Sequence, residues 1–97
     1  MNSGQQSNPI RRHVIYHGRV QGVCFRMISH ELSHNFQVVG YVRNLPDGTV
    51  ELEAEGEPAE VDRFLAAIAS EFKHNIANAD VRALPPGGGE GAFRITY

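Results

Sequence analysis

The sequence is poor in several features that mark particular classes of protein. Its single cysteine, Cys24, cannot form an intramolecular disulfide, which fits a reducing compartment such as the cytoplasm. No apolar run occurs near the N-terminus, so we expect neither a signal peptide nor a membrane-spanning segment. The formal net charge of only −2 argues against a general binder of polyanions such as nucleic acids. These absences favour a small protein of the cytoplasm.

What the sequence does contain predicts one domain behind a short leader. Of the 97 residues, 41% are hydrophobic and 21% are charged, as in an ordinary soluble domain. A chain of this size buries roughly two-thirds of its unfolded surface, so it can form a core without disulfides or metals. Residues 1–12 are polar with glycine and proline, and we expect a flexible leader in which Arg11 and Arg12 have no role. Residues 13–97 are expected to form the domain, as a monomer.

The charged residues are unevenly distributed along the chain. Residues 1–44 carry five arginines against the single acid Glu31, whereas residues 45–97 carry ten acids against four bases. A basic segment in a chain that is acidic overall predicts a local site for an anion.

The spacing of apolar residues predicts a succession of strands and helices. Alternation predicts strands, and apolar residues three and four positions apart predict helices that begin at Phe25 and Pro58. The predicted elements are a strand at 13–17, a helix at 25–36, strands at 37–44 and 49–56, a helix at 58–72, and strands at 79–84 and 93–97. Glu51, Glu53 and Glu55 alternate with core residues and are interpreted as a solvated face.

This order, β-α-β-β-α-β, predicts an α+β, ferredoxin-like sandwich. We expect an antiparallel sheet of four to five strands with both helices on one face. A helical crossover between the first two strands makes them parallel. Their C-terminal ends therefore lie at the same edge of the sheet, where residues 18–24 leave the first strand and Asn44 ends the second.

The segment GRVQGVC at Gly18–Cys24 joins the end of a strand to the start of a helix. Its glycines allow the backbone to approach a ligand, and the first helical turn adds unpaired N–H groups and a partial positive charge. Both features suit a phosphate group, although an ordinary strand-to-helix turn has the same pattern.

Two side chains next to this segment suit the same ligand. Arg26 lies in the first helical turn, where a cation is unfavourable unless an anion is bound, and guanidinium holds phosphate through two hydrogen bonds. An arginine that points into water is the alternative. Asn44 can hold and orient a water molecule because one amide both donates and accepts, but asparagine is also common in turns.

Two segments together resemble the acylphosphatase family: GRVQGVCFR at residues 18–26 and GYVRNLPDGTVE at residues 40–51. The similarity extends over about residues 13–97. It implies that Arg26 binds phosphate and that Asn44 positions the attacking water. It also implies a cradle of backbone N–H groups from Arg19, Val20, Gln21, Gly22, Val23 and Cys24.

The chain departs from the usual family pattern at two places. Many members have glycine in place of Cys24, and others have cysteine. The stretch Lys73–Ala79 lacks the Gly-Pro that commonly precedes the fourth strand, and we expect this to affect only a loop away from the site.

The resemblance implies small acyl phosphates as substrates, and inorganic phosphate as product and inhibitor. The conjugate acid of a carboxylate leaving group has a pKa of roughly 4, so its departure needs no general acid. The phosphate oxygens can accept the proton of the attacking water, so no protein base is needed. What remains is positioning and charge stabilisation, which need no metal and no other cofactor.

Other patterns favour different chemistry less well. His30-Glu-Leu-Ser-His34 matches the zinc motif H-E-x-x-H, but helical spacing places both histidines opposite the apolar stripe, towards solvent. Cys24 lacks the arginine of the C-x5-R motif of cysteine phosphatases. His17 beside the loop is interpreted as a strand-end side chain.

Two binding modules remain as alternatives to an enzyme. The predicted fold also occurs in RNA-recognition domains, but those stack bases on aromatic residues, and the third strand here is acidic and has none. A catalytically silent domain that only binds small anions is the second alternative. Intact Arg26 and Asn44 argue against it.

Overall fold

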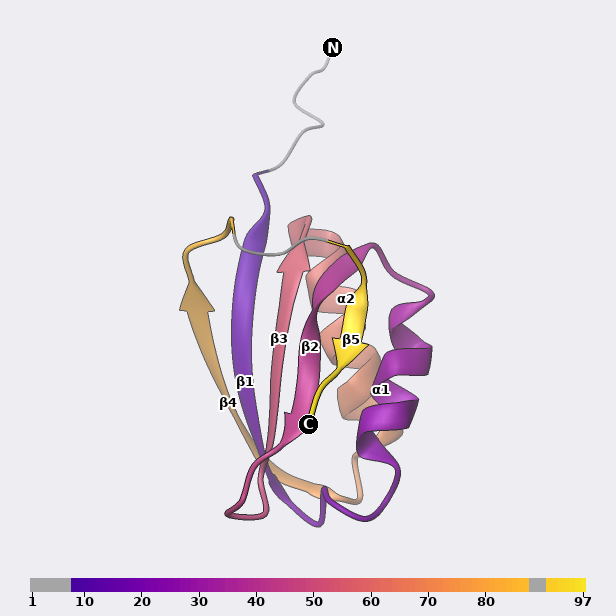
Figure 1. The fold of residues 1–97 in the computed structure, drawn as a ribbon. Coiled ribbons are helices and arrows are strands. Elements are labelled where there is room, and N and C mark those ends of the chain that lie inside the picture. The colour runs from indigo at the N-terminus through magenta and orange to yellow at the C-terminus, as the bar shows by residue number, and fades with distance from the viewer. Residues whose placement is uncertain (1–7, 88–90) are drawn as a thin grey trace.

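The computed structural model describes residues 8–87 and 91–97. Its elements are β1 (Ile10–Gly18), α1 (Phe25–Ser33), β2 (Val38–Asn44), β3 (Val50–Gly56), α2 (Pro58–Glu71), β4 (Ile76–Leu84) and β5 (Phe93–Ile95). The strands form one five-stranded sheet in the order β4-β1-β3-β2-β5, and both helices cover the same face of it (Figure 1). The predicted α+β, ferredoxin-like fold is confirmed. Within the described ranges, neither helix is long and apolar enough to cross a membrane.

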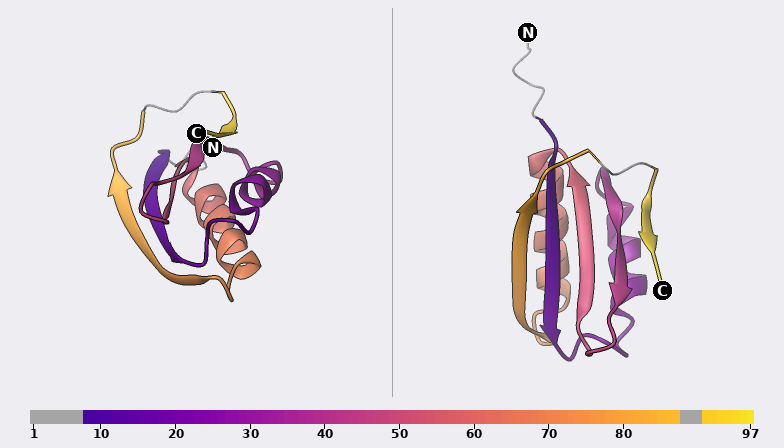
Figure 2. Two further views of the ribbon diagram at one scale, coloured as in Figure 1. Left: turned by 60° about the horizontal axis from the view of Figure 1, so that its bottom comes forward. Right: turned by 60° about the vertical axis from the view of Figure 1, so that its left-hand side comes forward.

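The directions of the strands place the ends of β1 and β2 together. Both strands are antiparallel to β3, so they run parallel to each other, as the helical crossover predicts. Their C-terminal ends lie at the same end of the sheet as the start of α1 (Figure 2). One pairing departs from the predicted antiparallel sheet: β5 runs parallel to β2, with Gly40 opposite Phe93, so the sheet is mixed.

The first strand begins before the predicted domain boundary. β1 starts at Ile10, so residues 10–12 of the expected leader belong to the sheet, and residues 1–7 lie outside the described residues. The Arg11 guanidinium forms an ion pair with Glu53, so the expectation that it has no role is wrong. The alternation of buried residues starts only at Val14, because backbone pairing and charge pairing hold the earlier part of the strand.

The core lies between the sheet and the two helices, and aromatic rings join its parts. Phe25 of α1 stacks on Phe72, with ring centroids 4.2 Å apart, and packs against Tyr16 of β1 at 5.1 Å. Phe64 of α2 meets Phe93 of β5 edge to face at 5.0 Å. Because Phe25 is the first residue of α1, its burial fixes the first helical turn against the sheet.

α1 is shorter than the predicted helix. It ends at Ser33, and the N–H groups of His34, Asn35 and Phe36 donate to carbonyls three residues earlier, at 3.2, 3.0 and 3.1 Å. Bonds of this type tighten the end of a helix. The predicted apolar stripe therefore reaches Phe36 in this tighter turn, beyond the end of the α-helix. Ser29 and Ser33 are buried although no apolar period marks them, because small side chains let the helix lie close to its neighbours.

The face of the sheet away from the helices carries paired charges. Glu51 of β3 bonds to the His13 ring of β1 at 2.8 Å and to the Arg43 guanidinium of β2. Glu53 pairs with Arg11 of β1. The central strand thus supplies carboxylates to cations on both of its neighbours. The interpretation of these glutamates as a solvated face is wrong, because strand pairing places cations beside them. Arg43 lies directly opposite Glu51, and the pairs to β1 are between diagonal neighbours.

Glu55 departs furthest from that interpretation. It is buried, and its carboxylate accepts the backbone N–H of Gly87 at 2.7 Å. This bond attaches the segment after β4 to the central strand. The rest of the loop predicted at 85–91 includes residues 88–90, which lie outside the described residues.

The ion pairs of Glu51 make part of the stability dependent on pH. Burial raises the pKa of the Glu51 carboxyl, but the hydrogen bonds from His13 and Arg43 outweigh burial and hold that pKa below its ordinary value. A depressed pKa means that folding favours the carboxylate. Its contribution to stability is therefore present above the unfolded pKa of about 4.3 and is lost as the pH falls through the lower folded pKa.

We predict that Glu51→Gln lowers the free energy of unfolding by about 1.5–3 kcal/mol at pH 7, the range for hydrogen bonds to a charged group. The deficit should shrink as the pH falls below about 4. Urea denaturation at a series of pH values measures it, and Glu31→Gln, at an exposed position of α1, is the matched control. A deficit that is the same at pH 7 and pH 3 would show that the ion pairs do not cause it.

Candidate active site

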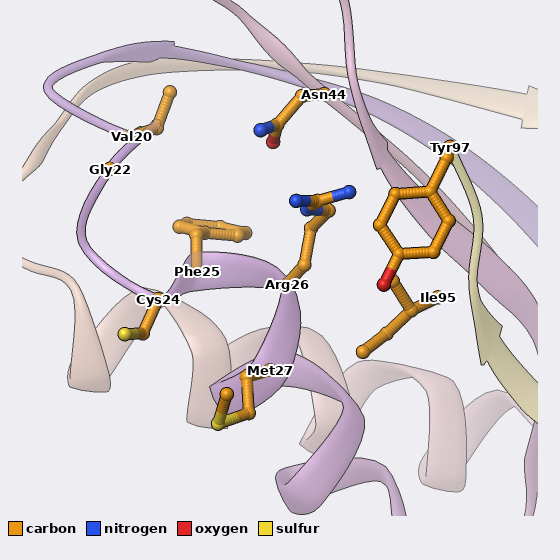
Figure 3. A pocket seen from close by; sticks show the side chains of 9 residues that line it. All are labelled: Val20, Gly22, Cys24, Phe25, Arg26, Met27, Asn44, Ile95 and Tyr97. Carbon is orange, nitrogen blue, oxygen red and sulfur yellow. The ribbon is translucent and has the colours of Figure 1, made fainter.

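One pocket lies at the end of the sheet where β1 and β2 finish. It has a volume of about 340 Å³, within the range of about 300–1,000 Å³ typical of small-molecule sites. Four segments line it: the loop after β1, the first turn of α1, the end of β2, and the residues from the end of β5 onwards (Figure 3). The lining residues are Val20, Gly22, Cys24, Phe25, Arg26, Met27, Asn44, Ile95 and Tyr97.

The loop after β1 is fixed at its start against the connection between α2 and β4. Gly18 has a φ of 125°, and a Cβ atom on it would lie 2.3 Å from the carbonyl oxygen of Asn75, so no other residue fits there. The backbone N–H of Arg19 donates to the same carbonyl at 2.9 Å. The Arg19 N–H that was expected in the cradle therefore already has a partner within the protein. The stretch Lys73–Ala79 is not remote either, because it holds the start of the loop.

The next residues of the loop alternate between the pocket and the rest of the protein. Val20, Gly22 and Cys24 line the pocket. Val23 packs against the core, and the side chain of Gln21 points to the turn between β2 and β3. The expected cradle residues therefore direct their side chains to two different sides. The side chains of Gln21 and Val23 point away from the pocket.

Gln21 joins the two motifs that the sequence singled out. Its side-chain amide donates to the carbonyl oxygens of Leu45 and Thr49, each at 2.8 Å. Those two residues also bond to each other, through the Leu45 N–H and the Thr49 carbonyl at 2.9 Å. Asn44 immediately precedes this turn. One side chain therefore connects the loop to the position from which Asn44 enters the pocket.

The positive end of α1 faces the pocket. Cys24 is the N-cap residue and has φ 62° and ψ 28°, a left-handed conformation, and it makes no side-chain capping bond. The first helical hydrogen bond runs from the Ile28 N–H to the Cys24 carbonyl at 2.9 Å, so the preceding N–H groups have no partner within the helix. No acidic residue lies in the first turn. This end of the helix is suited to an anion.

Arg26 extends from that first turn into the pocket. Its guanidinium lies over the Tyr97 ring, 4.6 Å from the ring centroid, and makes a long hydrogen bond of 3.4 Å to the Thr96 carbonyl. Among the described residues, no carboxylate forms an ion pair with it. The guanidinium is therefore held in place while most of its donors remain available to a ligand.

Asn44 ends β2, opposite Val50 of β3, and is half-buried. Its side-chain amide points into the pocket towards the Arg26 guanidinium (Figure 3). The structure thus brings together two residues that are far apart in the sequence, as the parallel arrangement of β1 and β2 predicts. An amide at this point can donate to one group and accept from another.

Four lining residues were not predicted as part of the site: Phe25, Met27, Ile95 and Tyr97. Phe25 and Met27 flank Arg26 in α1, and the other two reach the pocket because β5 pairs with β2, with Val42 opposite Ile95. The N–H of Thr96 continues this pairing with a 2.9 Å bond to the Val42 carbonyl. The neighbour of a short last strand cannot be read from its sequence.

The three histidines weighed for other chemistry from the sequence lie outside the pocket. His17 bonds to Asp80 of β4 at 3.0 Å. The rings of His30 and His34 lie edge to face with centroids 4.9 Å apart; His34 is exposed and His30 is half-buried. Within the described ranges, no group of three or more histidines, cysteines and acids is placed to hold a metal ion.

Comparison with known proteins shows which family the chain resembles. The profile of the acylphosphatase family matches residues 12–95. The chain is 38% identical over 89 residues to an acylphosphatase of Anaeromyxobacter dehalogenans, which covers 91% of this chain and 96% of the relative. It is 41% identical over 93 residues to an acylphosphatase of Geobacillus thermodenitrificans, covering 90% and 94%. The crystal structure of acylphosphatase from Bacillus subtilis matches with a TM-score of 0.81 and 28% identity, over 91% of this chain and 99% of that one.

We predict that Gln21→Met lowers the free energy of unfolding by about 1–2 kcal/mol, because methionine keeps the shape but removes two hydrogen bonds and leaves each carbonyl with its backbone N–H partner alone. Amide hydrogen exchange at Leu45 and Gly48 should also become faster, since the turn that Gln21 holds would open more often. Gln37→Met, at an exposed position, is the matched control. Equal exchange rates in the two variants would mean that Gln21 does not hold the turn.

Proposed function

Because the chain belongs to the acylphosphatase family, we propose that it hydrolyses the carboxyl–phosphate bond of small acyl phosphates to a carboxylate and inorganic phosphate. The observation that carries this proposal is the meeting of Arg26 and Asn44 in one pocket beside the positive end of α1. The pocket offers an anion a guanidinium and unpaired N–H groups as donors, and it offers a water molecule an amide. The identity to the named relatives supports the same activity.

In the proposed complex, the phosphoryl group lies on the loop after β1. Backbone N–H groups of the segment from Val20 to Cys24 and of the first helical turn donate to its oxygens, and Arg26 adds two parallel hydrogen bonds. The negative charge of the ligand offsets the unfavourable placement of a cation at the start of a helix. Among the described residues, no carboxylate forms an ion pair with Arg26. Its guanidinium can therefore bind the phosphoryl group without first breaking an ion pair.

The proposed chemistry is a single displacement at phosphorus. Asn44 holds a water molecule whose oxygen attacks the phosphorus atom, while the bond between phosphorus and the carboxyl oxygen breaks and its electron pair leaves with the carboxylate. The proton of the attacking water passes to a phosphate oxygen. Since the conjugate acid of the leaving group has a pKa of roughly 4, no general acid is required. Positioning and charge stabilisation supply the rate.

The same proposal covers the partners of the enzyme. It works without a metal or another cofactor, and inorganic phosphate competes with the substrate because it occupies the same cradle. We propose a monomer in the cytoplasm, in keeping with the single thiol of Cys24. An RNA-binding role is less well supported, because the open face of β3 carries Glu51 and Glu53 in ion pairs rather than aromatic residues.

We predict that the purified chain hydrolyses benzoyl phosphate, that EDTA does not change the rate, and that inorganic phosphate inhibits competitively. Consumption of benzoyl phosphate, measured over a range of substrate and phosphate concentrations and with and without EDTA, tests all three. If no benzoyl phosphate is turned over although inorganic phosphate binds, the chain is a silent anion-binding domain. Loss of activity in EDTA and its recovery with zinc would contradict the metal-free mechanism and direct attention to His30 and His34.

Asn44→Ala serves as the internal control of this experiment. It should reduce kcat by more than tenfold, equivalent to about 1.4 kcal/mol of activation free energy, while the melting temperature and phosphate binding persist. The loss falls on the rate because the oriented water is missing. Asn35→Ala, at an exposed position after α1, should keep full activity. A kcat in Asn44→Ala close to that of Asn35→Ala would remove Asn44 from the mechanism.

A further inference from the structure

A pair of histidines on α1 takes no part in the proposed chemistry. His30 lies in the last turn of α1, and His34 follows that turn as the C-cap residue. Because His34 keeps helical dihedral angles, with φ −66° and ψ −16°, the two side chains lie one turn apart on the same face. The pair lies towards the end of α1 opposite to the first turn, which adjoins the pocket (Figure 1). Two histidines at this spacing on a helix can bind one metal ion together.

The separation of the two rings suits a single ion held between them. Their centroids are 4.9 Å apart, and the rings meet edge to face. A ligating imidazole nitrogen lies about 2.0–2.1 Å from zinc, which puts the ion about 3.2 Å from the ring centroid. Two such centroids 4.9 Å apart subtend an angle of about 100° at the ion. That angle is close to the value in tetrahedral coordination, so one ion can contact both rings without a shift of the helix.

The two rings remain available as ligands. The rings of His13 and His17 each bond to a carboxylate of a neighbouring strand, at 2.8 and 3.0 Å. In contrast, His30 and His34 form no ion pair in the part of the chain that the structure describes. His34 is exposed and His30 is half-buried, so an ion can reach both. The pair also lies at the end of α1 where the helix dipole is negative, which favours a cation.

The pair offers two ligands and is not a catalytic zinc centre. Such centres hold the ion through three protein ligands, and no group of three or more histidines, cysteines and acids is placed to do so within residues 8–87 and 91–97. Glu31, the acid of the H-E-x-x-H motif, is exposed and does not share the face of its neighbour His30. Neither histidine lines the pocket. A bound ion would therefore leave the proposed chemistry unchanged.

We propose that His30 and His34 bind one divalent transition-metal ion such as Zn²⁺, with water in the remaining positions, and that the bound ion fastens the end of α1. Imidazole nitrogen is a ligand for zinc, nickel and copper, whereas magnesium prefers oxygen. The two ligands join the last turn of α1 to the tighter turn in which the N–H groups of His34, Asn35 and Phe36 donate three residues back. An ion that links them opposes fraying of this turn.

Isothermal titration calorimetry of the untagged chain with Zn²⁺, in a buffer free of phosphate, tests the site. The wild type should bind one equivalent. His34→Gln should lower the affinity by about 100-fold or more, because two linked ligands bind far more tightly than one alone. His74→Gln, at an exposed position after α2, should leave the affinity unchanged. All these variants keep Cys24, so binding at its thiol would not differ between them.

A double variant separates the spacing of the histidines from their number. His34→Gln combined with Asn35→His keeps a second histidine but sets it five residues from His30, on a different face, and it should bind as weakly as His34→Gln. Zn²⁺ should also slow amide exchange at Phe36 in the wild type and in neither variant that lacks His34. No binding by the wild type, or wild-type affinity in either of these variants, would overturn the inference. Hydrolysis of benzoyl phosphate that requires Zn²⁺ and is lost in His34→Gln would overturn the metal-free mechanism and leave the metal site in place.

Discussion

The site depends on one constraint of topology: two parallel strands that share an antiparallel neighbour end at the same edge of the sheet. β1 and β2 both pair with β3, so the loop after β1 and the turn after β2 must lie close together. Gln21 makes this proximity specific, since its amide bonds to the carbonyls on both sides of the turn. Gly18 fixes the other end of the loop against Asn75. A short segment held at both ends is already ordered before a ligand binds. Binding to its backbone therefore costs little conformational entropy of the loop.

Electrostatics then distinguishes the arginine of the site from those on the open face of the sheet. Arg11 and Arg43 each have a carboxylate partner on β3. Arg26 has none among the described residues, although it lies at the positive end of a helix with no acid in its first turn. Its contacts are an aromatic face and a backbone carbonyl, which orient a guanidinium without neutralising it. Such an arrangement leaves the charge for a bound anion.

The sequence predicted what local patterns determine and missed what long-range pairing determines. The positions of Arg26 and Asn44 followed from period, turn chemistry and one rule on crossovers. The start of β1 at Ile10 did not, because ion pairs across the sheet stabilise it and no apolar period marks it. The role of Gln21 could not be predicted, because its partners lie 24 and 28 residues away. Tyr97 reaches the pocket only because β5 pairs with β2 in parallel.

Thermal unfolding with and without phosphate tests most directly the claim that Arg26 is the partner of the anion. A ligand that binds only the folded state raises the melting temperature. At a ligand concentration one hundred times the dissociation constant, the free energy of unfolding rises by about 2.7 kcal/mol. Wild type and Arg94→Lys, a change at an exposed arginine of β5, should both gain this stability. Arg26→Lys should gain little, because an ammonium group cannot replace two parallel hydrogen bonds. A full gain in Arg26→Lys would contradict the account.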